Sequence, residues 1–487
     1  MLFNSITYAI FLAIVFMLYW FVFQRNLKLQ NFFIVVASYV FYGWWDWRFL
    51  LLIAFTSFCS WGSAELMQRI DDKKITTPFW SRKLLSASNI VLNLVVLCIF
   101  KYYNFFVDSF ISAFALAGIH MQFNTLQIIL PVGISFYTFQ ALSYSIDVYQ
   151  RKVEPTRDIV AFFAFIGFFP LLVAGPIERA KNLLPQFYVK RKFDYDKAVD
   201  GMRQILWGLF KKVVIADNCS VFVNQVFENY NELSSGTLVL GMFFFAFQIY
   251  GDFSGYSDIA IGTARLFGFN AMRNFNYPFF SRDVAEFWRR WHISLTTWFR
   301  DYLYFPLGGS RVSKIKVVRN TFIMYLVSGF WHGADWTFVI WGLYCALLFL
   351  PLILLNRNRK HTNDVAEGRL LPSFKEVLQM AWTFLLVSIG IIFFRAESLT
   401  VAMGYLVKMF SLNCTSIIQV TDNVEMFQNL ALVLILVTAE WFQRSKQHAL
   451  DLSHIQSPVL KHVIYYAIIA LIFVFYAHSQ AFIYFQF

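Results

Sequence analysis

The sequence predicts an all-α polytopic integral membrane protein, and three observations lead to that fold class. Of the 487 residues, 58% are hydrophobic and only 14% are charged, and the mean hydropathy is +0.54. Soluble proteins contain roughly a quarter charged residues, so this chain could not cover its surface with polar side chains. Stretches such as 84–100 and 431–439 are continuously apolar, whereas the strands of a membrane barrel alternate apolar and polar residues. The spanning elements are therefore predicted to be helices.

Apolar segments recur along the whole chain, from 6–23 near its start to 463–481 near its end. A membrane helix needs roughly 20 mostly apolar residues, and the composition and loops together predict about twelve spans. The first segment has no preceding basic region and no A-x-A cleavage site, so it is interpreted as a span that is retained rather than a signal peptide. No linker or low-complexity tract interrupts the chain, which predicts a single membrane domain over 1–487.

The formal net charge is +12, from 41 basic and 29 acidic residues. On a soluble protein this excess would suggest nucleic acid, but here the basic residues lie in short loops between apolar segments, where they set membrane topology. No nucleic-acid partner is therefore predicted. The basic clusters are assigned to the cytoplasmic side, and they fall at 25–28, 69–83, 151–157, 179–212, 265–319, 357–375 and 444–461. Both chain ends are then expected on the periplasmic or exterior side of the membrane.

Two segments, 159–175 and 281–309, do not fit as ordinary spans. The first contains Pro170 and ends before Pro176, and the second is rich in tryptophan and arginine. Non-helical backbone at membrane depth is tolerated only inside protein or beside a water-filled cavity, so both are predicted to be re-entrant or interfacial. Helical spacing within the second predicts one helix at the headgroup level, anchored by Trp288, Trp291, Leu295, Trp298 and Tyr302.

Polar residues concentrate in the apolar stretch QIYGDFSGYSDIAIG, which contains Asp252, Ser254 and Asp258. An ionisable group at the centre of a span costs roughly 2.5–3.5 kcal/mol on insertion scales, so it marks a functional or pairing site. The two carboxylates are expected to pair with Arg289 or Arg290 and to order a polar core. Close helix packing is the other explanation for this stretch, because its glycines form a small-residue face at Gly251, Gly255 and Gly262.

Two histidines stand out because their surroundings are apolar and aromatic. His292 lies in FWRRWHISLTTWFRDYLYFPLGG and His332 in SGFWHGADW, 40 residues further on. A buried neutral imidazole can take a proton from a hydroxyl and return it to a leaving group, which suits acyl transfer between a thioester and an alcohol. A hydrogen-bonded core histidine would look the same in sequence, so spacing alone leaves both interpretations open.

Other kinds of active site are not indicated. The sequence has neither HExxH nor a cysteine pair for zinc, and it lacks a Walker A loop and a G-x-S-x-G elbow. We therefore expect no metal and no permanently bound cofactor. Unpaired buried thiols are expected at all five cysteines, because none has CxxC spacing: Cys59, Cys98, Cys219, Cys345 and Cys414.

The sequence resembles a known family, the membrane-bound O-acyltransferases (MBOAT), in the branch of the bacterial alginate O-acetyltransferase membrane subunit. The similar motifs run nearly from end to end. They are SYVFYGWWDWRFL from 38, LPVGISFYTFQALSYSIDVYQ from 130, FFPLLVAGPIERAKNLLPQF from 168, GLFKKVVIADN from 208, QIYGDFSGYSDIAIG from 248, and the two histidine motifs.

The resemblance implies an all-helical membrane body with a polar tunnel that meets a cytoplasmic acyl donor on one side and an acceptor on the other. It implies that His332 of the WHG-type motif is the catalytic base and that His292 is the second functional histidine. The tunnel's polar core would comprise Asp252, Ser254, Asp258, Arg289, Arg290 and Trp331. The implied activity moves an acyl group, expected to be acetyl from acetyl-CoA, to an exported polysaccharide such as alginate or to a periplasmic SGNH-like acetyltransferase, with membrane lipids around the body.

Two alternatives stay open. Within the enzyme class, the acceptor could instead be peptidoglycan, teichoic acid, a lipid or a protein. In another class, a proton-coupled transporter or flippase could use Asp252, Asp258 and the histidines as a relay, although no inverted repeat is visible. The terminal AFIYFQF is expected at the outer face, where Tyr484 would receive the acyl group transiently or help dock the partner, unless this aromatic end is only an interfacial anchor.

Overall fold

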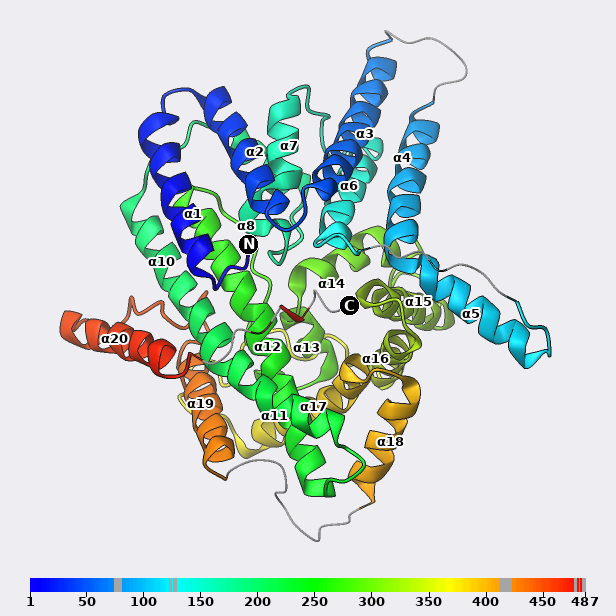
Figure 1. The fold of residues 1–487 in the computed structure, drawn as a ribbon, viewed down its shortest axis with the longest axis vertical. Coiled ribbons are helices and arrows are strands. Elements are labelled where there is room, and N and C mark those ends of the chain that lie inside the picture. The colour runs from blue at the N-terminus through cyan, green and yellow to red at the C-terminus, as the bar shows by residue number, and fades with distance from the viewer. Residues whose placement is uncertain are drawn as a thin grey trace. The chain divides into compact units, whose positions relative to one another are not determined.

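The computed structural model describes residues 1–73, 81–121, 125, 129–411, 423–476, 480 and 482–483. All regular secondary structure within these ranges is helical, which confirms the predicted all-α fold. The chain divides into two compact units, residues 1–199 with 263–271 and residues 200–262 with 272–487. Two long helices, α10 (Tyr195–Leu209) and α12 (Ser235–Leu266), contribute residues to both units (Figure 1).

The first unit is built from the helices that precede α10. They are α1 (Ile6–Met17), η1 (Leu18–Val22), α2 (Leu27–Gly43), α3 (Arg48–Asp71), α4 (Arg82–Leu97), η2 (Cys98–Tyr102), α5 (Tyr103–Leu116), α6 (Ile134–Tyr149), α7 (Ile159–Gly167), α8 (Phe169–Leu172), α9 (Ala180–Leu183) and η3 (Leu184–Phe187). The predicted first span corresponds to α1 and η1. The segment 159–175 is broken into α7 and α8, with Pro170 in the first turn of α8, where proline is tolerated. Its depth in a membrane stays a prediction.

Buried polar side chains and one glycine fix the packing of the first unit. The almost wholly buried α6 lies against α3 and α4, which run side by side in Figure 1. It starts after Gly133, whose φ is +74° and where a Cβ would lie 2.8 Å from the Leu172 carbonyl oxygen, so only glycine fits there. Elsewhere in this unit the buried Arg191 guanidinium donates to Gln30 Oε1 at 3.0 Å and to Asn31 Oδ1 at 2.5 Å.

The second unit carries both histidine motifs. Besides most of α10 and α12 it contains η4 (Phe210–Ala216), α11 (Asp217–Glu228), η5 (Pro278–Phe280), α13 (Val284–Arg290), α14 (Ile293–Phe299), η6 (Arg300–Tyr304), α15 (Lys314–His332), α16 (Trp336–Leu354), α17 (Phe374–Arg395), α18 (Leu399–Phe410), α19 (Asn423–Phe442) and α20 (Pro458–Val474). The last predicted span, 463–481, is shorter than expected because α20 ends at Val474.

Within the described ranges, six helical stretches are long and apolar enough to cross a membrane. They are Arg48–Asp71, Arg82–Leu116, Ser235–Leu266, Trp336–Leu354, Phe374–Arg395 and Val424–Phe442. Shorter apolar helices add to them at Ile6–Val22, Leu399–Phe410 and Pro458–Val474. The protein is therefore a multi-pass membrane protein, and the figure of about twelve spans stays a prediction. The apolar window of α12 is 72% buried, against 28–39% for the other five stretches, so α12 is the most enclosed of them.

Glycines allow α12 to approach α10 and η4 closely. A Cβ on Gly255 would lie 2.8 Å from the Gly208 carbonyl oxygen, and one on Gly251 would lie 2.8 Å from the Lys211 carbonyl oxygen. A Cβ on Gly262 would likewise lie 2.5 Å from the carbonyl oxygen of Gly201. The small-residue face predicted from the sequence therefore packs against another helix, as small residues do between membrane helices.

Candidate active site

His332 is the last residue of α15, and the tight connection to α16 fixes its position. Gly333 follows it directly, and a Cβ there would lie 2.1 Å from the Phe338 ring. Asp335 then caps α16 by accepting the Thr337 backbone N–H at 2.8 Å. The glycine of the WHG motif is therefore required for the turn to close, and the closed turn holds the histidine at the end of its helix.

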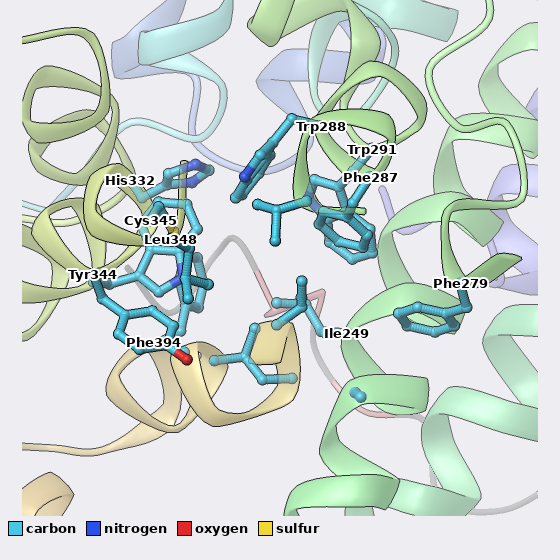
Figure 2. Close-up of a pocket in the computed structure, with 16 residues that line it drawn as sticks. Ile249, Phe279, Phe287, Trp288, Trp291, His332, Tyr344, Cys345, Leu348 and Phe394 are labelled. Carbon is cyan, nitrogen blue, oxygen red and sulfur yellow. The ribbon is translucent and has the colours of Figure 1, made fainter. Parts of the chain in front are cut away.

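Aromatic rings surround the imidazole of His332, which is only 5% exposed. The ring centroids of Trp331, Trp341 and Phe394 lie 5.0, 5.1 and 5.3 Å from its own, all edge-on. In Figure 2 His332 lies on one side of an apolar pocket, near Trp288, while Phe279 lies on the opposite side. Trp331, which the sequence assigned to the polar core, is thus a neighbour of His332.

His292 lies at the break between α13 and α14, in the left-handed conformation with φ of +43°. Its Nδ1 is 3.1 Å from Oδ1 of Asn274, and the same Oδ1 accepts the backbone N–H and the hydroxyl of Ser294 at 3.3 and 2.9 Å. The Asn274 amide nitrogen donates to Ser257 Oγ at 3.1 Å. Because a backbone N–H can only donate, this Asn274 atom is the oxygen, and Nδ1 of His292 carries the proton. Nε2 is then the acceptor nitrogen of the ring.

The two histidines are brought together by the fold. Their ring centroids lie 6.4 Å apart, and both side chains line one small cavity between α13, α14 and α15. Burial lowers the pKa of His292 to about 3, so this imidazole is neutral at physiological pH. A neutral buried imidazole is suited to accept a proton from a hydroxyl group.

Two further cavities of different character adjoin the cavity that holds the histidines. The apolar pocket of Figure 2 has a volume of about 30 Å³ and shares Trp288, Trp291 and His332 with the histidine cavity. A much larger cavity of about 560 Å³ shares Trp288 and Thr296 with the histidine cavity and carries three arginines, Arg289, Arg300 and Arg359. The histidine cavity therefore adjoins both a wide cavity that carries three arginines and a small apolar pocket.

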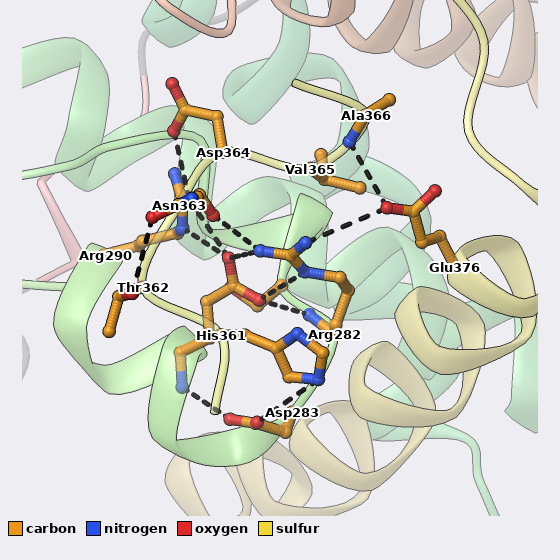
Figure 3. A network of polar contacts seen from close by, with 12 residues as sticks. Arg282, Asp283, Arg290, His361, Thr362, Asn363, Asp364, Val365, Ala366 and Glu376 are labelled. Carbon is orange, nitrogen blue, oxygen red and sulfur yellow. Dashed lines mark hydrogen bonds and ion pairs between the residues drawn. The ribbon is translucent and has the colours of Figure 1, made fainter. Parts of the chain in front are cut away.

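A network of ion pairs fixes the loop that forms part of the wide cavity. Glu286 of α13 accepts from Arg282 at 3.0 Å and from Arg290 at 3.0 Å, and Arg290 also pairs with Asp364 of the loop at 3.1 Å (Figure 3). Arg289 donates to the carbonyl oxygens of Asn358 and His361 in the same loop. These arginines therefore hold the 356–366 stretch against α13.

The predicted pairing of the α12 carboxylates with Arg289 or Arg290 is wrong. Asp252 pairs with Lys212 at 2.7 Å, and Asp258 pairs with Lys211 at 2.6 Å. Lys211 also donates to Ser254 Oγ at 2.9 Å. Both lysines belong to η4, a π-helical stretch that packs against α12. Buried in the protein, these lysines are ion-pair partners rather than the cytoplasmic loop charges that the sequence suggested.

The prediction of one continuous interfacial helix through the tryptophan series is also wrong. Trp291 has extended backbone angles and His292 is left-handed, so the series is divided among α13, α14 and η6. Trp288 and Trp291 line the cavities beside the histidines instead of serving only as headgroup anchors. Among the described cysteines, Cys219 and Cys345 are buried as expected, and Cys345 lines the apolar pocket, but Cys98 is exposed and Cys59 is half-buried.

Of the aromatic residues in the terminal AFIYFQF, the structure describes Phe482. Phe482 is fully buried against Tyr256 of α12, with ring centroids 4.4 Å apart, so this aromatic residue is not a surface anchor. Tyr484 lies outside the described residues. Sequence reasoning also missed Asn274 and Glu440. Glu440 is buried in α19 and accepts the hydroxyl of Tyr250 at 2.8 Å. The sequence does contain a signal for Glu440, because a glutamate in the apolar stretch 431–442 is as unusual as the α12 aspartates.

The chain is similar to known membrane acyltransferases. The model of the family described as MBOAT, membrane-bound O-acyltransferase, matches residues 155–394, which include both histidines. The probable alginate O-acetylase AlgI of Pseudomonas aeruginosa is 42% identical over 79% of this chain and 70% of its own length. Its counterpart in Azotobacter vinelandii is 41% identical over 79% and 73% of the two chains. The peptidoglycan O-acetyltransferase of Helicobacter pylori is 33% identical over 84% of this chain and 79% of its own length.

Proposed function

This chain belongs to the membrane-bound O-acyltransferase family and is an O-acyltransferase, and we propose that it transfers an acetyl group from acetyl-CoA toward a hydroxyl group of an exported polysaccharide. The observation that carries the proposal is the cavity that His292 and His332 share, which adjoins both the basic cavity and the apolar pocket. Because the chain belongs to an acyltransferase family, we do not retain the alternative of a transporter or flippase.

The donor is assigned to the basic cavity of about 560 Å³. Coenzyme A carries a diphosphate and a further phosphate, and arginine side chains bind phosphate by charge-assisted hydrogen bonds. Arg300 and Arg359 would supply those contacts, and the pantetheine arm would extend past Trp288 toward the histidines. We place this cavity on the cytoplasmic side of a bacterial inner membrane, where acetyl-CoA is available.

The acyl group is assigned to the small apolar pocket beside His332. A cavity needs roughly 10–15 Å³ to hold one water-sized group, so the pocket's volume of about 30 Å³ suits an acetyl methyl and not a long acyl chain. In the reaction, His332 would take the proton of the attacking hydroxyl as its oxygen bonds to the thioester carbonyl carbon. Collapse of the tetrahedral intermediate breaks the carbon–sulfur bond, and the same imidazole returns the proton to the thiolate. Nε2 of His292 would accept a hydrogen bond from a second hydroxyl of the acceptor, because the attacking hydroxyl gives its one proton to His332.

The acceptor is proposed from the relatives' names. Two of them are named as alginate O-acetylases and one as a peptidoglycan O-acetyltransferase, so a hydroxyl-bearing envelope polysaccharide is the shared class. We propose a polysaccharide such as alginate as the final acceptor, with a periplasmic SGNH-like acetyltransferase as the relay partner. Peptidoglycan is the second candidate, because the Helicobacter relative is similar over most of the chain.

The test uses purified protein in detergent or nanodiscs with radiolabelled acetyl-CoA. Release of coenzyme A thiol and transfer of label are measured separately, with alginate oligosaccharides and with peptidoglycan fragments, each in the presence and absence of the periplasmic partner. The proposal expects label on one acceptor and none with His332→Ala. Thiol release that is equal in wild-type and His332→Ala protein would overturn it.

A further inference from the structure

The second unit encloses a short stretch from the end of the chain, which we name the terminal segment and define by its described residues Gln480, Phe482 and Ile483. Phe482 is 0% exposed and Ile483 is 3% exposed. The Phe482 ring contacts those of Tyr256 and Phe253 on α12, with centroids 4.4 and 6.0 Å away. This stretch follows α20 but is not part of any long helix, so its burial needs its own explanation.

Main-chain groups of the terminal segment bind a cluster of buried charges. Asp252 Oδ2 accepts the backbone N–H of Ile483 at 2.7 Å, and Lys212 Nζ donates to the carbonyl oxygen of Gln480 at 3.1 Å. Lys212 also pairs with Asp217 at 2.8 Å and with Asp252 at 2.7 Å. The cluster holds two carboxylates and one ammonium group, and the Arg395 side chain lines the same cavity. The N–H of Ile483 gives the buried Asp252 a second donor besides Lys212, and a buried carboxylate needs such partners.

The terminal segment is also connected to the candidate active site through one aromatic ring. Phe253 contacts Phe482 on one side and packs edge-on against His292 on the other, with ring centroids 4.6 Å apart. Phe253 is fully buried, so its position depends on both neighbours. Loss of the Phe482 contact would open space beside Phe253. The Phe253 ring could then shift away from His292, which would lose part of its packing.

The surroundings of the cluster make reversible binding feasible. A cavity of about 160 Å³ adjoins it and is lined by polar side chains that include Gln248 and Arg395. Gln480 and Ile483 form part of its wall. Water in this cavity can solvate Asp217 and Asp252 when the segment leaves, because a cavity of this size with several polar partners holds water. Departure of the segment would therefore leave hydrated charges and not dry ones.

We propose that Lys212, Asp217 and Asp252 form a docking site for the main chain of the terminal segment, and that docking holds Phe253 against His292 so that acyl transfer depends on it. Recognition is by the backbone N–H of residue 483 and the carbonyl group of residue 480, with Phe482 filling an aromatic site. The dependence of transfer on docking rests on the proposed function, whereas docking itself does not.

Docking is tested by hydrogen exchange at the backbone amides of Gln480 and Phe482 in the full-length protein. Proline at 483 has no N–H to donate to Asp252, whereas alanine keeps this donor. A hydrogen bond to a charged group corresponds to a roughly tenfold or larger change in an equilibrium, so Ile483→Pro should accelerate exchange at least about tenfold relative to Ile483→Ala. Equal exchange in the two variants would overturn main-chain docking. Tyr476→Ala, at an exposed position outside the segment, serves as the unaffected control.

The link to transfer is tested with a chain that ends at Tyr476 and with the synthetic peptide AHSQAFIYFQF. The shortened protein should lose transfer roughly tenfold or more while it keeps its elution volume, and the peptide should restore it in trans. The same peptide with Ile483→Pro should fail to do so. Full-length Ile483→Pro retains Tyr484, so a loss in that variant does not come from a missing phenol. Full transfer by the shortened chain would overturn the coupling, whereas absence of transfer in wild-type protein would refute the proposed function and leave the exchange result to decide docking.

Discussion

The imidazole rings of His292 and His332 lie with their centroids 6.4 Å apart, although the two residues belong to different helical motifs. The left-handed conformation at residue 292 separates α13 from α14, and the glycine turn after residue 332 ends α15. Both histidines therefore lie at helix termini and line one cavity. The fold thus brings together two imidazoles that are 40 residues apart in the sequence.

We expect His332→Ala to reduce turnover by about 10²-fold or more, the usual effect of losing a general base. Coenzyme A binding should change little, because His332 does not line the basic cavity. Turnover and the dissociation constant for a non-hydrolysable acetyl-CoA analogue are the two measurements. His454→Gln, at an exposed histidine, is the matched control. Residual turnover above roughly a tenth of wild type would exclude the role of base.

Asn274 is expected to act as a positioning residue that sets the proton on Nδ1 of His292. Asn274→Ala removes the acceptor and leaves Ser294 without it as well, so turnover should fall about tenfold. Asn274→Asp keeps an acceptor but places a negative charge beside the ring, which raises the pKa of His292. The pH profile of turnover should therefore show an acid limb at higher pH in Asn274→Asp than in wild type. Superimposable profiles for the two proteins would contradict this role.

Charges in the basic cavity should affect donor binding rather than chemistry. Arg300→Gln and Arg359→Gln are each expected to raise the Michaelis constant for acetyl-CoA about fivefold, with turnover unchanged, since loss of uniform binding has this kinetic form. The effect should shrink at high salt, because exposed charges are screened. Arg48→Gln removes an exposed arginine that lines none of the described cavities and is the control. A fall in turnover with an unchanged Michaelis constant would instead mean that these arginines act in the chemical step and not in donor binding.

The sequence predicted the fold class and both histidines because these depend on local signals. Apolar stretches of span length indicate helices directly, and a histidine among tryptophans and glycines is conspicuous. The ion-pair partners of the buried aspartates of α12 were not predictable in the same way. Lys211 and Lys212 are adjacent in sequence and resemble a basic loop, but in the fold both lie in η4 and pair with carboxylates of α12.

Residues that act through backbone geometry were missed for a related reason. Asn274 lies in an irregular stretch between α12 and η5, and no period connects it with His292, 18 residues later. The positive φ of His292 is uncommon for a residue with a side chain, so helical spacing through 288–302 suggested one helix where the protein has three. Tertiary packing decided both features.

The burial of His292 should make the folded protein sensitive to acid. Its pKa is lowered to about 3 by burial in the folded state, whereas the unfolded chain has the ordinary value of about 6.5. Between these two values the unfolded state binds a proton that the folded state does not bind. The contribution of this one group to the free energy of unfolding is therefore fully present above pH 6.5 and falls by about 1.4 kcal/mol per pH unit as the pH drops toward 3.

His292→Gln keeps a polar side chain of similar size without a titrating group, so its thermal midpoint should fall less steeply between pH 6 and about pH 4.5. Scanning fluorimetry of both proteins in the same detergent measures the two slopes, with His454→Gln as the control for an exposed histidine. Parallel slopes for wild-type and His292→Gln protein would mean that the imidazole takes up a proton in the folded state, and it would then be a cation beside Phe253 rather than a neutral acceptor.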